Sequence, residues 1–223
     1  MNIYKNKSVS KLEEYRNFVF SLAGVSNHQD FSKALISAHE KGNNLTAGIQ
    51  DEAMKSKLFH ELAKELSWKK MAAEYLNVNP KHLNIIFPHF RLDLPDRFKN
   101  DSNKLLLPWH QEAEYYLKFN NCSKESIVIS TVLHDISESG GALVVAKNSE
   151  EQLLNHQEEY MDPIKKRFFR VECSPPDDYV ITETKFGESV VFDFLTKHKS
   201  GYNKSDLVRL TFIVRVSDTR LIK

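Results

Sequence analysis

Three triplets with a histidine two residues before an acid are the residues best suited to chemistry in this chain. Nine histidines and 30 acidic residues among 223 predict about one such triplet by chance. The chain has three: His28-Gln29-Asp30, His110-Gln111-Glu112 and His156-Gln157-Glu158. On a strand, residues two apart face the same side, so an imidazole and a carboxylate can bind one metal ion. On a helix, the same spacing makes the two side chains diverge.

Local context separates the three triplets. The first lies at a predicted helix start, where an acid complements the helix dipole, and the third lies in a charged, helical-looking run. His110 and Glu112 follow the apolar run Leu105–Leu107 and precede the pair Tyr115-Tyr116, a context that is compatible with a strand. The sequence therefore favours His110 and Glu112 as metal ligands.

A third ligand and an anion-binding group are predicted further along the chain. His198 follows an apolar run, and after a turn at Gly201 the chain reaches Arg209, at the start of a strongly alternating strand. Two histidines and one carboxylate leave open metal positions, as in non-haem Fe(II) oxygenases. A guanidinium group pairs with a carboxylate through two hydrogen bonds, so Arg209 suits an anionic co-substrate.

The elements that must position these residues change character once along the chain. All seven prolines lie from Pro80 onward, so the first third is free of this helix breaker. The spacing of apolar residues predicts an amphipathic helix around Phe18 to Val25, a helix over residues 28–41 and one long helix over 51–77, with a polar loop at 42–50. We therefore expect residues 1–80 to form a mostly helical packing segment.

Short strand-like runs follow Pro80. In the last run Val208, Leu210, Phe212, Val214 and Val216 share one face. A charged, helical insertion is predicted near 149–167, and helices followed by many short strands indicate a sandwich or barrel with helices packed on one side. The predicted strands are Leu83–Phe87, Phe90–Leu94, Lys104–Leu107, Ile127–Leu133, Ala142–Ala146, Tyr179–Thr184, Ser189–Phe194 and Val208–Val216.

Composition excludes several classes of function. Apolar residues make up 41%, enough for a core, and the formal net charge of +1 argues against a nucleic-acid binder. The sequence contains no run of eighteen apolar residues, so no membrane span is predicted. Cys122 and Cys173 are expected to be free thiols in a reducing cytoplasm. The sequence leaves the oligomeric state open.

The motifs resemble those of the phytanoyl-CoA dioxygenase family of Fe(II)/2-oxoglutarate oxygenases, over about residues 84–216. The most specific part is the last, with the form His-x-Ser-Gly-x-Asn and an arginine eleven residues after the histidine. The motifs occur in the family's order: Pro108-Trp109-His110-Gln111-Glu112, then Ser137 to Ala146 with Gly140-Gly141-Ala142-Leu143, then Gly187 to Phe194, then His198 to Arg209.

The resemblance implies a fold, a set of cofactors and a reaction. The fold is a mainly β, cupin-like double-stranded β-helix (jelly roll) over residues 81–223, flanked by helices and forming one domain with residues 1–80. The implied reaction hydroxylates a small molecule with O₂ and releases succinate and CO₂ from 2-oxoglutarate. Fe(II) would be bound by His110, Glu112 and His198, the distal carboxylate of 2-oxoglutarate by Arg209 and Ser200, and Asn203 would shape the loop.

Two departures from the family pattern stand out. Glu112 replaces the usual aspartate, which moves the carboxylate outward by about one bond length. Lys147-Asn148-Ser149 replaces a Pro-Gly-Ser-His turn that supplies no ligand. The glutamate keeps open a second interpretation, a binding module without activity on the same fold. A cupin-like metalloenzyme that does not use 2-oxoglutarate, and so does not need Arg209, is a third.

Substrate contacts are predicted from residues near the metal triplet. Trp109 and Gln111 flank the ligands, Tyr115 follows them, and Arg91 shares a strand face with His89. Each has an ordinary alternative, since core packing suits Trp109, Gln111 and Tyr115, and a surface ion pair suits Arg91.

Overall fold

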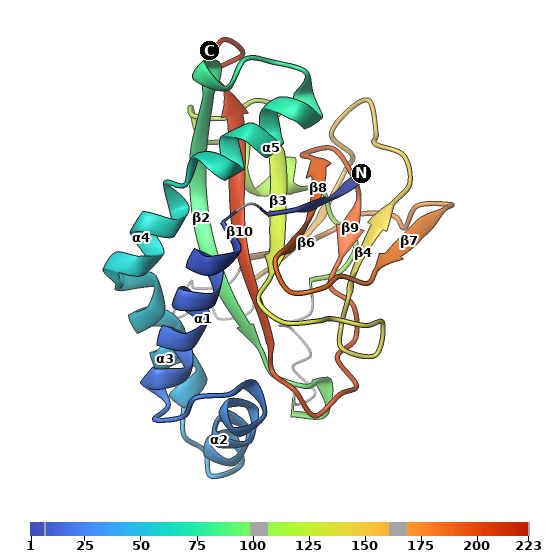
Figure 1. The fold of residues 1–223 in the computed structure, drawn as a ribbon. Coiled ribbons are helices and arrows are strands. Elements are labelled where there is room, and N and C mark those ends of the chain that lie inside the picture. Colours follow the sequence, from blue (N-terminus) through green and yellow to red (C-terminus); the bar gives the residue numbers. More distant parts are fainter. Residues whose placement is uncertain (7, 99–106, 161–168, 223) are drawn as a thin grey trace.

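Two antiparallel sheets form the body of the molecule, and Figure 1 shows them with helices on one side. The computed structural model describes residues 1–6, 8–98, 107–160 and 169–222. The mainly β architecture with a helical first third is confirmed. The larger sheet has the order β1 (Asn2–Lys5), β8 (Glu188–Asp193), β3 (Ile127–Val132), β10 (Arg209–Asp218) and β2 (Leu83–Asp93). The smaller sheet consists of β7 (Tyr179–Thr182), β4 (Leu143–Ala146) and β9 (His198–Lys199).

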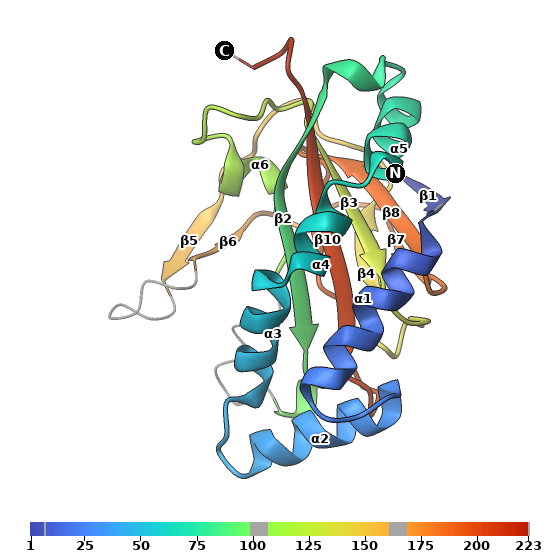
Figure 2. The same ribbon diagram turned by 60° about the vertical axis from the view of Figure 1, so that its left-hand side comes forward.

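Five helices cover the face of the larger sheet that points away from the smaller one (Figure 2). None of the described helices is long and apolar enough to cross a lipid bilayer. The helices are α1 (Val9–Leu22), α2 (His28–Glu40), α3 (Leu45–Lys55), α4 (Lys57–Ala63) and α5 (Leu66–Leu76), and a short α6 (Glu112–Tyr116) lies apart from them. Two 3₁₀ turns, η1 (Pro80–His82) and η2 (Asp96–Phe98), flank β2.

Helix α2 begins as its sequence predicts, but the predicted long helix over 51–77 is wrong. Asn27 caps α2 by accepting a hydrogen bond from the Asp30 N–H at 2.9 Å. The chain breaks at Ser56, which adopts an extended conformation and caps α4 through the Phe59 N–H. It breaks again before α5, at Glu65. The three short helices replace one straight rod, and α3 already begins within the predicted polar loop.

Strand β10 is central to the core because one of its faces packs against the helices and the other faces the smaller sheet. The alternating row from Leu210 to Val216 is buried against the helices, as the sequence predicts. Phe212 lies at the centre of this row. Its ring centroid is 5.4 Å from that of Phe59, 5.7 Å from that of Tyr15 and 5.8 Å from that of Trp68. The opposite row, which starts at Arg209, faces the smaller sheet.

Other predicted elements are corrected by the structure. Two predicted strands are joined into the single strand β2, which carries a bulge at Phe87, where φ is +46°. The predicted helical insertion near 149–167 is wrong in its described part, because β5 (Gln157–Tyr160) pairs with β6 (Phe169–Glu172) as a hairpin. The predicted strand over 104–107 lies almost wholly outside the described residues. Cys122 and Cys173 are both buried and unpaired, as expected.

Replacing Phe212 tests this account of the core. Phe212→Ala should lower the free energy of unfolding by about 3–5 kcal/mol, because it removes a fully buried ring from between helices and sheet. Chemical denaturation measures this loss. Leu66→Ala is the matched control, since Leu66 is 66% exposed and its loss should cost less than about 0.5 kcal/mol. Equal losses for the two variants would contradict the proposed core.

Candidate metal centre and cavity

The three predicted metal ligands meet between the two sheets. His110 and His198 lie side by side because each donates its backbone N–H to the other's carbonyl oxygen at 3.0 Å. Glu112 Oε2 lies 3.4 Å from His198 Nε2 and 3.9 Å from His110 Nε2. All three side chains are buried, and their donor atoms lie within 4.8 Å of one another. The arrangement can hold one metal ion.

Backbone carbonyl groups set the orientation of both imidazole rings. His110 Nδ1 donates to the Pro108 carbonyl at 2.7 Å, and His198 Nδ1 donates to the Thr196 carbonyl at 3.1 Å. With the proton on Nδ1, the lone pair on each Nε2 is directed toward Glu112. Burial and the neighbouring His198 lower the pKa of His110 to about 3, so its ring is neutral at physiological pH. Two imidazoles and a carboxylate fit Fe(II), Co(II) or a similar divalent ion.

The local structure of the triplet differs from the prediction. The backbone of Gln111 is extended, so His110 and Glu112 do reach the same side, but the chain then turns into α6 at Glu112. The predicted strand is therefore wrong at this point. Tyr115 and Tyr116 lie on that helix and both line the cavity, whereas strand alternation would have placed them on opposite sides.

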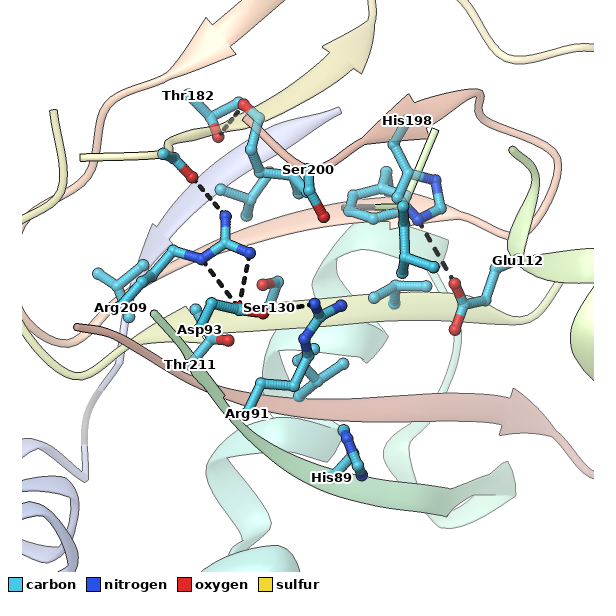
Figure 3. A pocket seen from close by; sticks show the side chains of 18 of the residues that line it. His89, Arg91, Asp93, Glu112, Ser130, Thr182, His198, Ser200, Arg209 and Thr211 are labelled. Carbon is cyan, nitrogen blue, oxygen red and sulfur yellow. Dashed lines mark hydrogen bonds and ion pairs between the residues drawn. The ribbon is translucent and has the colours of Figure 1, made fainter. Parts of the chain in front are cut away.

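A cavity of about 420 Å³ extends from the three ligands toward Arg209. Figure 3 shows His198 and Glu112 at one end and Arg209 with Asp93 at the other. Ser200, Thr182 and Thr211 also line it. The volume and the mixed polar and apolar lining are typical of a small-molecule site.

Arg209 is buried and held firmly in place. Its Nε and Nη2 donate to Asp93 Oδ2 at 3.2 and 2.7 Å, and its Nη1 donates to the Gly141 carbonyl. Asp93 Oδ1 also accepts from Arg91 Nη2 at 2.7 Å. Arg209 and Asp93 are directly paired across β10 and β2, so sheet register places this ion pair at the end of the cavity.

The loop that precedes Arg209 packs closely against the Gly140-Gly141 turn. A Cβ atom at Gly201 would lie 2.0 Å from the Ala142 carbonyl oxygen, so only glycine fits there. Asn203 Nδ2 donates to the Leu207 carbonyl at 2.8 Å, and its Oδ1 accepts from Ser205 Oγ at 2.7 Å. Asn203 thus has the contacts expected of a residue that shapes the loop, while Ser200 lines the cavity.

The predicted substrate residues separate into two groups. Arg91 and Tyr115 line the cavity. Trp109 instead packs against Val144, with Lys199 Nζ 4.9 Å from its ring centroid, outside the cavity lining. Gln111 is fully buried; its Nε2 donates to the Leu195 carbonyl and its Oε1 accepts from the Leu154 N–H, both at 2.7 Å.

Comparison with known proteins gives the chain's family. The model of the phytanoyl-CoA dioxygenase family matches residues 28–211. The chain belongs to this family. The family assignment that the sequence motifs suggest is thereby confirmed. No curated protein matches the sequence.

Solved structures show the same fold at low sequence identity. ThoJ, a non-haem monooxygenase, is 16% identical with a TM-score of 0.62, and the match covers 98% of this chain and 75% of ThoJ. EvdO2 from Micromonospora carbonacea var. aurantiaca, also solved with 2-oxoglutarate, is 21% identical with a TM-score of 0.54, over 74% of this chain and 62% of EvdO2. The epimerase SnoN is 14% identical with a TM-score of 0.51, over 75% of this chain and 59% of SnoN.

Two charged residues of the phytanoyl-CoA dioxygenase-like cavity escaped the sequence analysis. Asp93 pairs with Arg209, and Arg215 pairs with Glu112. A signal for Arg215 was present, because it shares the alternating face of β10 with Arg209. No local pattern points to Asp93, whose role depends on the register between β2 and β10.

A metal-binding measurement tests the predicted ligands. Co²⁺ at about 100 times its Kd should stabilise the fold by about 2.7 kcal/mol, or roughly 5–10 °C in Tm. His198→Ala should lose this increase in stability, because only two of the three proposed ligands remain to bind the metal. His28→Ala, from the first triplet, should keep it, since His28 contacts the Val208 carbonyl and is not among the residues that line the cavity. An increment that persists in His198→Ala would contradict the site.

Proposed function

We propose that this protein is an Fe(II)/2-oxoglutarate-dependent oxygenase that hydroxylates a small molecule and releases succinate and CO₂. The observation that carries the proposal is the common cavity. It joins a buried His-Glu-His set at one end to a buried arginine at the other. Family membership supports the same chemistry.

Each group has a role in this proposal. The Nε2 atoms of His110 and His198 and the Oε2 atom of Glu112 would hold iron. When bound, iron(II) and 2-oxoglutarate supply the oxidising chemistry, in which O₂ converts the 2-oxo acid to succinate and CO₂ and oxygen is inserted into a substrate C–H bond. The surrounding protein positions the reactants and keeps out water.

Arg209 has donors to spare for the distal carboxylate of 2-oxoglutarate. A guanidinium has five N–H donors. Within the described part of the chain, three bonds to Asp93 and Gly141 engage three of them. The remaining two donors suit a carboxylate, with Ser200 as a further hydrogen-bonding group in the cavity. Asp93 would keep the guanidinium oriented while 2-oxoglutarate binds.

The charges in the cavity favour a substrate with a negative group. Among the described residues, the cavity is lined by three arginines, Arg91, Arg209 and Arg215, and by two carboxylates, Asp93 and Glu112. Burial and the nearby Arg215 lower the pKa of His89, another lining residue, to about 4, so it adds no charge at neutral pH. Iron(II) and 2-oxoglutarate would cancel each other in charge, so the described lining residues would keep one positive charge. We propose that the substrate binds with an anionic group near Arg91 and with Tyr115 beside it, and we assign no substrate contact to Trp109 or Gln111.

Succinate release provides the test of this function. Purified protein with Fe(II), ascorbate and 2-oxoglutarate in air should form succinate, faster with a substrate found in a panel of small carboxylic acids. Arg209→Met should raise the KM for 2-oxoglutarate by about 10- to 100-fold, the cost of hydrogen bonds to a charged group. The KM for 2-oxoglutarate of Arg209→Lys should lie between those of wild type and Arg209→Met. Lysine keeps the positive charge but loses the two-point hydrogen bonding of a guanidinium group.

Controls separate this function from its alternatives. His110→Ala should form no succinate, and Arg220→Met, which removes an exposed arginine outside the cavity, should behave as wild type. Turnover of a substrate without 2-oxoglutarate, unaffected by Arg209→Met, would favour the cupin-like metalloenzyme. Metal binding without any turnover would favour the binding module. Either result would overturn the proposal.

A further inference from the structure

We propose that Arg215 is a positioning residue that makes Glu112 a one-oxygen metal ligand. This inference rests on the metal centre proposed above and concerns a residue that has no part in that assignment. Arg215 lies on β10, six residues after Arg209, and its side chain points into the same cavity.

The guanidinium of Arg215 is enclosed by three groups. Its Nε and Nη2 lie 2.6 and 2.5 Å from Glu112 Oε1, and its Nη1 donates to the Phe87 carbonyl at 2.7 Å. Its central carbon lies 4.5 Å from the centroid of the Tyr116 ring. Arg215 itself is 7% exposed. A side chain held by so many contacts has one well-defined position.

The two carboxylate oxygens of Glu112 therefore have different partners. Oε1 accepts both hydrogen bonds from Arg215, while Oε2 faces the Nε2 atoms of His110 and His198. A carboxylate can bind a metal through one oxygen or two. With Oε1 engaged by Arg215, only Oε2 is available to a metal. Three protein donors then leave three positions of an octahedral ion open, which two-point binding of a 2-oxo acid and binding of O₂ would both need.

The longer side chain at position 112 explains why such a restraint is useful. Glutamate has one more rotatable bond than the aspartate usual in this family, so its carboxylate samples more positions. The ion pair with Arg215 restricts this freedom, because Nε and Nη2 of Arg215 both contact Oε1.

Local backbone features bring the partners together. Glu112 and Tyr116 lie one turn apart on α6, so both reach the same guanidinium. The register between β10 and β2 shifts between Ile213 and Arg215, next to the bulge at Phe87, whose carbonyl accepts from Arg215. Phe87 adopts a positive φ that is unfavourable for a bulky residue, and bulges of this kind are common beside functional sites.

Metal affinity tests the inference without relying on turnover. Arg215→Met should weaken Co²⁺ binding by about 10- to 100-fold, the usual effect of losing a group that holds a metal ligand. Arg215→Lys, which keeps the charge, should weaken it less. Arg220→Met is the matched control, because it removes an arginine from a carboxylate pair near the end of the same strand and should change the Co²⁺ affinity by less than about twofold.

A second background shows whether Arg215 acts through Glu112. In Glu112→Ala, which lacks the carboxylate, the further change Arg215→Met should weaken Co²⁺ binding by less than about threefold. Equal losses in both backgrounds would overturn the inference. So would an Arg215→Met protein that has a lower Tm but binds Co²⁺ as wild type does, because Arg215 would then only support the fold.

The same titrations keep this inference separate from the proposed function. If wild type binds Co²⁺ no better than His198→Ala does, the metal centre itself is wrong and the inference fails with it. If wild type binds Co²⁺ in a His198-dependent manner and Arg215→Met binds equally well, only the role of Arg215 is wrong.

Discussion

Charges inside a buried cavity must be paired, and this constraint shapes the site. An isolated buried carboxylate or guanidinium would cost several kcal/mol. Here Asp93 is shared by Arg91 and Arg209, and Glu112 is held by Arg215. Arg209 and Arg215 also donate to the backbone, to the Gly141 and the Phe87 carbonyl respectively. The result is a polar but ordered cavity, in which the proposed metal ligands and the proposed 2-oxoglutarate arginine are held by defined contacts.

Strand β10 connects this polar site to the stability of the fold. Its inward row carries Arg209 and Arg215, and its outward row is packed against the helices around Phe212. Since side chains alternate along a strand, the packed outer row and the cavity-lining inner row share one backbone. The helical first third therefore supports the site from behind the sheet. It also contributes Gln50, whose Oε1 accepts from the Leu92 N–H beside the cavity.

The sequence predicts those parts of the structure that depend on local patterns or on family motifs. Alternation gives the two faces of β10, a capping asparagine gives the start of α2, and the motif order gives His110, Glu112, His198 and Arg209. Sequence-based prediction fails for features that depend on tertiary packing. Ser56 could continue a helix or cap the next one, and the local sequence does not decide between the two. Partners such as Asp93 follow from strand register, which one sequence does not reveal.

Glu112 stands where the family usually has aspartate, and its contacts show how the longer side chain is accommodated. A longer ligand alone would leave a carboxylate free to swing or to bind through both oxygens. Here α6 begins at that residue, and Arg215 takes one of its oxygens, so the extra methylene is accommodated by the helix start and by one arginine together. The change is thus coupled to a residue about one hundred positions away in the chain. Glu112 and Arg215 contact each other directly, so a substitution at either position should be considered together with the other.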